Sequence, residues 1–268
     1  MGERRVTGAA VQRVAERLSE RDRSVLADVA RVRVLTGRQV ERLHFCDLAG
    51  RHRDRTRRRV LERLTSWQLL TPLERRIGGA RAGSAGLMYA LGPAGQRLLA
   101  MEANRSLDGR ARHPGTPTDR FLLHNLTVAE LYVALVEASH RGDLAFVDYR
   151  AEPACWWRSS EGEWIKPDAL AVVANGEVED SWAIEVDMAT ESLPTLRRKL
   201  TAYLNLALDG EHGPGGGPLP RVLVAVPDEQ RLAAVRGLVR SLPEPAEQLL
   251  VVTIHDQAAA LIHKVLKE

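Results

Sequence analysis

Apolar residues recur at helical spacing in three segments of the first 70 residues, which predicts short helices over Ser19 to Val32, Leu35 to Leu43 and Arg51 to Leu64. Ser19 and Thr36 lie at the starts of the first two segments, and hydroxyl side chains are favoured at helix N-caps. A polar break at 49–50 separates the second helix from the third. The pattern therefore predicts a compact group of three helices.

The third predicted helix combines a narrow apolar face with a basic remainder. Val60, Leu61 and Leu64 are spaced to face inward. The other positions carry six arginines: Arg51, Arg53, Arg55, Arg57, Arg58 and Arg59. Two short apolar strands follow, over Leu69 to Leu73 and Leu87 to Leu91. The segment that joins them is rich in Arg and Gly and contains Arg75, Arg76 and Arg81.

The pattern changes after a Pro- and Gly-containing segment at 104–119, which we interpret as a linker. Beyond it we expect, in chain order, a helix, three strands, a helix, a strand, a helix, a strand and a helix: 122–138, 144–149, 164–173, 181–187, 194–208, 222–226, 229–242, 249–254 and 256–267. Continuous apolar strands between helices indicate a sheet that is covered on both faces. The expected fold class is α+β, with one domain at 19–103 and an α/β domain at 120–268.

Charge divides the chain in the same place. Residues 1–120 hold 25 arginines and 13 acidic residues, a balance of +12, whereas residues 121–268 hold 13 basic and 22 acidic residues, a balance of −9. This asymmetry favours two domains with different partners. Arginine suits phosphate and base-edge contacts because its donors form a planar fork.

Several classes of protein are disfavoured by composition. The two cysteines, Cys46 and Cys155, have no zinc or disulfide spacing, and we expect both in the core. The longest uncharged apolar runs are far shorter than the roughly 20 residues that span a bilayer. No signal peptide is visible at the N-terminus, so we expect a cytoplasmic protein without a membrane partner.

Three acidic residues interrupt the apolar strands of the second half. Asp168 follows Pro167 in the second strand, and Glu185 and Asp187 lie two apart in the third, which places them on one face of a strand. Buried acids are unfavourable unless they are paired, hydrogen-bonded or bound to a cation. Carboxylate oxygens suit Mg²⁺, which polarises phosphodiesters. The competing interpretation is a polar pocket, or ion pairs with Arg197 and Arg198.

The first half resembles a winged helix-turn-helix domain, in the order helix, helix, Arg-rich helix, hairpin and helix over residues 19–103. The resemblance implies that the third helix enters the major groove of double-stranded DNA. It also places Arg75, Arg76 and Arg81 on the wing, close to phosphates.

The second half resembles the PD-(D/E)XK restriction-endonuclease-like fold. The resemblance rests on the element order and on Pro167-Asp168 followed by Glu185-Val186-Asp187. It implies that Asp168 and Glu185 hold a metal ion, expected to be Mg²⁺, and that Glu130 on the first helix is an accessory acid.

That family places a catalytic lysine two residues after the second acid, where this chain has Asp187. Lys199 on the next helix is the candidate replacement, and Lys166 is a weaker one. The candidate catalytic set is therefore Glu130, Asp168, Glu185, Asp187 and Lys199.

The chain as a whole resembles the replication-relaxation family of bacterial plasmid and mobile-element proteins over roughly 19–208. The resemblance rests on 35–43, 124–126, 166–168, 185–187, 190–192 and 199–203. It implies a DNA-binding protein of replication or relaxation with a catalytically silent nuclease-like domain. The alternatives are a Mg²⁺-dependent endonuclease and a transcriptional regulator. Expected partners are double-stranded DNA, replication or mobilisation proteins, and a second copy of the chain.

Three tryptophans lie close to the acidic residues: Trp156, Trp157 and Trp164. Aromatic side chains of this kind stack on unpaired bases, but they also pack in cores and at partner surfaces. Only Arg158 and Lys166 supply positive charge among them, and the second half is acidic, so the sequence favours packing or a partner surface.

Overall fold

The computed structural model of the chain describes residues 7–76, 86–104, 115, 117–176 and 178–267. The chain divides into two compact units, 1–129 and 130–268. Helices and strands are both well represented, which confirms the α+β class. Much of the predicted linker lies outside the described residues, and the division between the units falls further along, within a helix.

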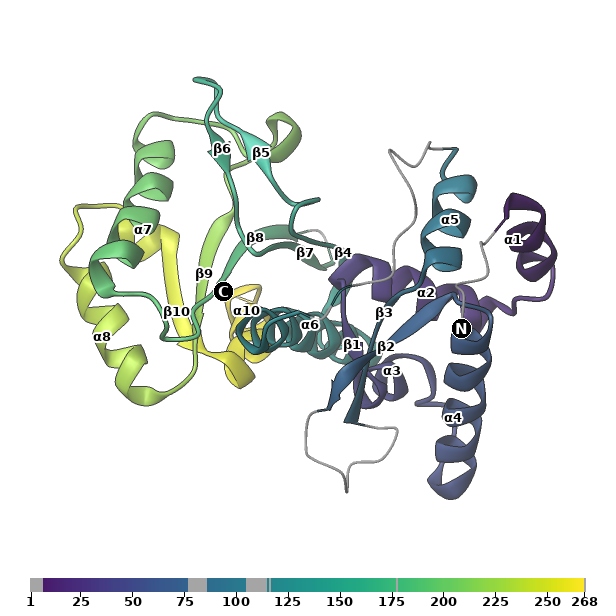
Figure 1. Cartoon of the computed structure of the whole chain (residues 1–268). Coiled ribbons are helices and arrows are strands. Elements are labelled where there is room, and N and C mark those ends of the chain that lie inside the picture. Colours follow the sequence, from purple (N-terminus) through teal and green to yellow (C-terminus); the bar gives the residue numbers. More distant parts are fainter. Residues whose placement is uncertain (1–6, 77–85, 105–114, 116, 177, 268) are drawn as a thin grey trace. The chain divides into compact units, whose positions relative to one another are not determined.

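The first unit combines short helices with a small sheet. Its elements are α1 (Gly8–Ala15), α2 (Glu20–Val32), β1 (Leu35–Thr36), α3 (Gly37–His44), α4 (Gly50–Ser66), β2 (Leu70–Arg76), β3 (Leu87–Leu91) and α5 (Pro93–Glu102). The three strands pair in the order β1-β3-β2, antiparallel throughout (Figure 1). The three predicted helices and both predicted strands are confirmed, whereas α1 and β1 were not predicted.

Both predicted N-caps are present as capping boxes. The Ser19 hydroxyl accepts from the backbone N–H of Asp22 at 3.2 Å, and the Asp22 carboxylate accepts in return from the Ser19 N–H at 3.0 Å. Thr36 and Gln39 make the same reciprocal pair at the start of α3, at 3.1 and 2.9 Å. Each box satisfies donors that a helix start leaves free, which fixes where α2 and α3 begin.

Helix α6 (Asp119–His140) contains the boundary between the units. On the first unit's side, Leu122 and Leu126 belong to a buried cluster with Val34, Leu73, Met88 and Ala90. By length and composition α6 could also cross a membrane, which a count of uninterrupted apolar runs misses. Of its most apolar 18-residue window, 56% is buried, as expected for a core helix.

The second unit is built around a five-stranded mixed sheet. Its elements are β4 (Ala145–Ala151), β5 (Trp157–Arg158), β6 (Trp164–Ile165), β7 (Ala169–Asn175), β8 (Val178–Val186), α7 (Leu193–Leu208), β9 (Arg221–Val226), α8 (Glu229–Arg240), α9 (Ala246–Leu249), β10 (Leu250–Ile254) and α10 (Ala258–Val265). The sheet order is β10-β9-β8-β7-β4. β8, β9 and β10 are parallel, and β4, β7 and β8 form an antiparallel meander.

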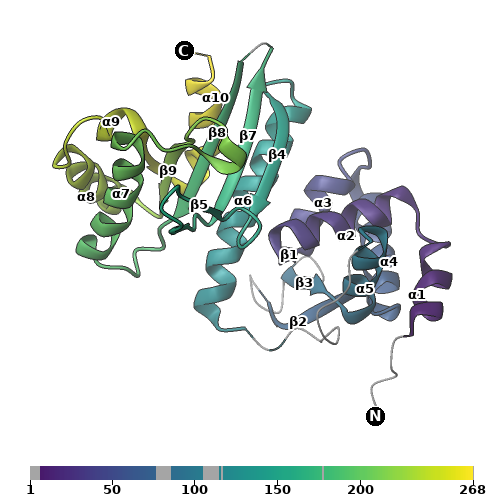
Figure 2. The same cartoon turned by 90° about the horizontal axis from the view of Figure 1, so that it is seen from above.

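Helices cover this sheet on both sides, as predicted. Helices α7 and α8 pack with β9 and β10 in one buried cluster, and Figure 2 shows α10 and α6 on the other side of the strands. Five consecutive residues of β9 are buried as a result. Glu185 and Ala183 lie two residues apart in β8, so both face the same side of the sheet. Ala183 belongs to the cluster with α7 and α8. The sheet therefore directs the Glu185 carboxylate toward α7.

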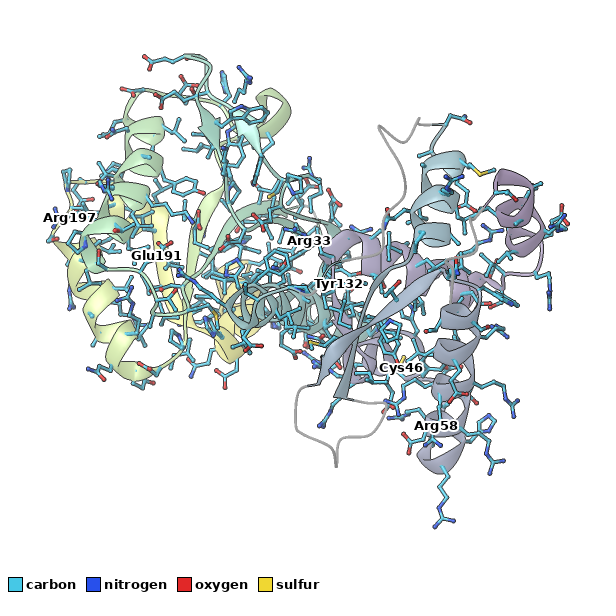
Figure 3. All side chains as sticks on the ribbon, in the orientation of Figure 1. Arg33, Cys46, Arg58, Tyr132, Glu191 and Arg197 are labelled. Carbon is cyan, nitrogen blue, oxygen red and sulfur yellow. The ribbon has the colours of Figure 1, made fainter. Side chains whose placement is uncertain are left out.

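Two expectations were wrong. The strand predicted over 164–173 is two strands, β6 and β7, separated at Lys166 to Asp168. Pro167 explains the break, because proline has no N–H to donate to a ladder. Cys155 is buried as expected, but Cys46 is exposed in the segment between α3 and α4 (Figure 3).

Candidate functional site

The α4 helix has two distinct faces. Arg57, Val60, Leu61 and Leu64 are buried, at spacings of one, three and four residues that place them on one side. The other side carries four exposed arginines: Arg51, Arg55, Arg58 and Arg59. Arg58 is labelled in Figure 3. Among the described residues, no ion pair occupies any of these four guanidinium groups.

The other two arginines of the predicted DNA-binding helix are held inside the first unit. Arg57 is 3% exposed, and its Nε lies 3.2 Å from Oε2 of Glu41. Arg53 donates from Nε to the Leu48 carbonyl at 2.7 Å, and its Nη1 lies 4.0 Å from Oε1 of Glu41. Both arginines therefore tie α4 to α3 and the turn between them, and the exposed face consists of the remaining four.

The predicted wing arginines cannot be placed in the same way. Arg81 lies outside the described residues, and so do the side chains of Arg75 and Arg76, whose backbone ends β2. Arg38, by contrast, is exposed in the first turn of α3 and was not singled out from the sequence.

Asp168 and Glu185 come together across two neighbouring strands. Ala169 of β7 pairs with Ile184 of β8, and continuing this register by one residue places Asp168 opposite Glu185. The Asp168 N–H donates to the Ile184 carbonyl at 2.9 Å, and Oδ2 of Asp168 accepts from the Val186 N–H at 2.7 Å. Asp168 is therefore fixed by the sheet itself.

The chain before Asp168 is anchored by Cys155. Its thiol donates to the Pro167 carbonyl at 3.1 Å, and the Glu152 N–H donates to the Asp168 carbonyl at 2.9 Å. Burial raises the pKa of the Cys155 thiol to about 12, so the thiol keeps the proton that it donates. These bonds hold the entrance of β7, and with it Asp168, in one position.

Glu185 is the buried centre of the carboxylate cluster. It is 2% exposed, its Oε2 forms an ion pair with Nζ of Lys199, and its Oε1 accepts from the Tyr203 hydroxyl at 2.6 Å. Burial raises the pKa of the Glu185 carboxyl to about 7, Lys199 opposes that shift and the nearby Asp168 adds to it. The structure thus brings together Asp168, Glu185 and Lys199 of the predicted catalytic set.

Glu185 and Asp168 also shift the pKa values of Lys199 and Tyr203. Burial acts to lower the pKa of Lys199, but Glu185 and Asp168 act in the opposite direction and the net pKa is raised. Burial, followed by the Glu185 carboxylate, raises the pKa of Tyr203 well above its usual value. Lys199 is therefore held as an ammonium ion and Tyr203 as a neutral donor.

Asp187 occupies a separate network. Its Oδ2 accepts from Nε of Arg231 at 2.6 Å, and its Oδ1 accepts from the Ala189 N–H at 2.8 Å. Arg231 also donates to the carbonyl of Glu191 at 2.8 Å. His255 places Nε2 3.1 Å from the carbonyl oxygens of Asp187 and Ala225, so Nε2 carries the proton. This network holds the turn that leads into α7.

The remaining candidates lie at other positions. Glu130 is half-buried on α6, and Lys166 is exposed with Nζ 5.0 Å from the centre of the Trp156 ring. Arg197 donates to the Ser241 hydroxyl and lies on the outer side of α7 (Figure 3). Of the two lysines considered, Lys199 is the one that pairs with Glu185.

Sequence reasoning missed Tyr203 and Arg231 as partners of the acids. Tyr203 lies four residues after Lys199, and this spacing puts both on one face of α7, so a signal for Tyr203 was present. Arg231 is separated from Asp187 by 44 residues, with α7 and β9 between them, and its role depends on the packing of α8.

Few possible metal ligands gather at the carboxylate cluster. Among the described residues, no group of three or more His, Cys, Asp or Glu side chains could hold one. Mg²⁺, however, is typically bound through one or two carboxylates together with substrate phosphates and water. Asp168 and Glu185 supply that number of carboxylates.

The family model for replication-relaxation proteins matches residues 26–222, well over half of the chain. The chain therefore belongs to the replication-relaxation family, and this membership suggests a role in plasmid or mobile-element replication. No curated protein matches the chain.

Proposed function

We propose that this protein binds double-stranded DNA through α4 and acts in the replication of a plasmid or mobile element. The observation that carries the proposal is the exposed face of Arg51, Arg55, Arg58 and Arg59, whose charges no described acid neutralises. Unpaired arginines on one helix face are the arrangement that contacts phosphates and base edges. A cytoplasmic location follows, because plasmid DNA lies there.

The arrangement of the first unit supports a winged helix-turn-helix domain. The order α2, β1, α3, α4, β2, β3 and the sheet order β1-β3-β2 are those of that fold. In such domains the helix at the place of α4 enters the major groove. The buried Arg57–Glu41 pair contributes by fixing α4 against α3.

Salt-dependent binding of a DNA duplex tests this proposal. Each phosphate contact contributes about −0.9 to the slope of log K against log salt concentration. We expect Arg55→Ala and Arg58→Ala each to weaken duplex binding and to reduce the slope by about 1 if the side chain contacts phosphate. If one of them reads a base edge instead, we expect sequence preference to relax at one position.

The matched control is Arg240→Ala, which removes an exposed arginine at the end of α8 in the second unit. We expect it to leave both the affinity and the slope unchanged. Equal losses for Arg240→Ala and Arg58→Ala would show that net charge, and not the α4 face, accounts for binding.

A second candidate function is metal-dependent cleavage of DNA, and the pairing of Lys199 with Glu185 favours it. The order α6, β4, β7, β8, α7, β9 is that of the restriction-endonuclease-like core, and Lys199 supplies the cation that the position of Asp187 lacks. Asp168 and Glu185 would hold Mg²⁺, whose chemistry is to polarise a phosphodiester and activate water. Lys199 would stabilise negative charge on the phosphate.

Incubation of supercoiled plasmid with Mg²⁺ or Mn²⁺ tests the second candidate. We expect nicking or linearisation by the wild type and its loss in Asp168→Asn and Glu185→Gln. Glu179→Gln removes an exposed carboxylate from the same strand as Glu185 and serves as the control. Duplex binding without cleavage under either metal would leave the second unit as a catalytically silent scaffold.

A further inference from the structure

The β5–β6 hairpin presents two different faces. Trp157 pairs with Ile165 across the hairpin, and both belong to or pack against the cluster that includes Leu196, Leu200 and Tyr203 of α7. Arg158 pairs with Trp164, and successive strand residues alternate between faces, so this second pair lies on the side away from the core. The hairpin therefore has one buried pair and one outer pair.

The outer pair is an open aromatic surface with a cation on it. Trp164 is 51% exposed, and Cζ of Arg158 lies 4.6 Å from the centre of its ring. Arg158 also donates to the Gly162 carbonyl at 3.4 Å, which keeps the guanidinium in place. Half of the Trp164 side chain is therefore accessible to a ligand, and an exposed aromatic ring is a surface on which a nucleobase can stack.

Residues other than Trp164 anchor the hairpin. Trp157 and Ile165 fix the base of the hairpin to the core, and the tip is held by Glu211, which accepts from the Ser160 N–H at 3.0 Å and from the Ser160 hydroxyl. With both ends secured, Trp164 remains a rigid surface, and rigid surfaces bind with little loss of conformational entropy.

The hairpin adjoins the carboxylate cluster. Lys166 and Pro167 connect β6 directly to Asp168, and Trp157 packs in the cluster that contains Tyr203, the partner of Glu185. Two cations lie along the hairpin, where Arg158 and Lys166 are each placed over a tryptophan ring, at 4.6 and 5.0 Å. The acids of the hairpin, Glu161 and Glu163, lie in the turn that joins Arg158 to Trp164.

We propose that the β5–β6 hairpin binds an unpaired stretch of DNA next to the carboxylate cluster, with a nucleobase stacked on Trp164 and the phosphates of that strand on Arg158 and Lys166. The inference rests on the proposed function, in which DNA is the ligand, and it adds that part of this DNA is single-stranded. Stacking tolerates any base, because every base has an aromatic face, so this contact selects unpaired DNA and not a sequence.

Fluorescence anisotropy of the full chain with a labelled mixed-sequence single-stranded oligonucleotide, and separately with the fully paired duplex, tests the proposal. Trp164→Leu keeps an apolar side chain on the hairpin but removes the ring. We expect it to weaken single-strand binding about tenfold and to leave duplex binding unchanged. Trp164→Phe restores a ring and is expected to recover most of the affinity.

Leu208→Ala is the matched control, because Leu208 is 57% exposed at the end of α7 in the same unit. It is expected to change neither affinity, and thermal melting of every variant checks that the fold is intact. Absence of single-strand binding, equal single-strand binding by Trp164→Leu and the wild type, or an equal loss on duplex would each overturn the inference. Loss of duplex binding with a retained Trp164-dependent single-strand affinity would instead refute the proposed role of α4.

Discussion

The ion pair between Lys199 and Glu185 joins a side chain that is almost completely buried to one that is partly exposed. The Glu185 side chain is 3% exposed, whereas 38% of the Lys199 side chain is in contact with solvent. Removing one partner therefore has a different consequence from removing the other. Without Glu185 the Lys199 side chain keeps part of its contact with solvent, but without Lys199 a buried carboxylate loses its counter-ion.

Lys199→Met is expected to destabilise the protein in a pH-dependent way. Burial raises the pKa of Glu185 to about 7 even with Lys199 present, and loss of the cation raises it further. The unfolded chain ionises near 4.5, so unfolding releases a proton and stability falls as the pH rises above that value. We expect little change at pH 5 and a loss of about 3 kcal/mol at pH 8, measured by urea unfolding. In the double variant with Glu185→Gln this pH dependence should disappear.

Asp22 is expected to contribute far more to stability than an exposed acid of the same unit. It is completely buried, and its oxygens accept from Arg63 at 2.6 and 2.8 Å and from Ser19 at 3.0 and 2.8 Å. Asp22→Ala should lower the free energy of unfolding by about 3 kcal/mol, because it removes one half of the capping box and the link between α2 and α4. Asp47→Ala breaks the exposed pair with Arg21 and should lower it by less than about 1 kcal/mol. Similar losses for both variants would contradict this reasoning.

Two helical glycines are expected to respond to alanine in opposite directions. A Cβ at Gly95 in α5 would lie 2.3 Å from the Leu69 carbonyl oxygen, so Gly95→Ala forces the backbone apart and should be destabilising by about 1–3 kcal/mol. A Cβ at Gly237 in α8 meets nothing within 4 Å, so Gly237→Ala should be stabilising by about 1 kcal/mol through helix propensity. Thermal melting of the two variants distinguishes them directly, and a stabilised Gly95→Ala protein would refute the close packing of α5 on the residue that precedes β2.

His255 should make the protein less stable in weakly acidic solution. Burial lowers the pKa of its imidazole below the usual 6.5, against the opposing effect of the Asp187 and Ala225 carbonyls. The unfolded chain takes up a proton near pH 6.5 and the folded chain does so only at lower pH, so stability falls as the pH drops through this range. The fall is limited to about 1.4 kcal/mol per pH unit. Urea unfolding at pH 7.5 and 5.5 measures it, and His255→Gln, which keeps an N–H donor, should remove this contribution.

Periodicity predicted most of the helices and strands, because alternation and helical spacing are local properties of the chain. The spacing also indicated that Arg57 is buried, although its residue type suggested an exposed side chain. Arg57 follows the inner-face spacing of Arg53, Val60 and Leu64, yet its charge suggested a solvent-exposed side chain, and its burial depends on Glu41 from the preceding helix. For arginines with an acid within reach, spacing was therefore a better guide than charge.

The carboxylate cluster could be predicted only in part. Asp168 and Glu185 were recognised because acids stand out in apolar strands, and the strand register brings them together. The proximity of Lys199 and the pairing of Asp187 with Arg231 depend on how α7 and α8 pack on the sheet. No local pattern contains this information, since helix rotation is set by contacts between residues that are distant in sequence.

Because Leu122 and Leu126 are buried with Val34, Leu73 and Met88, the first turns of α6 complete the hydrophobic core of the first unit. The Pro- and Gly-containing segment suggests a fragment that stops at residue 103. Such a fragment lacks Leu122 and Leu126 and would expose Val34, Leu73 and Met88 to water. Each buried leucine is worth about 1.5–3 kcal/mol, so such a fragment loses a sizeable share of a small domain's stability. Fragments and chimaeras that divide the chain at 129 or later are the ones that keep this core whole.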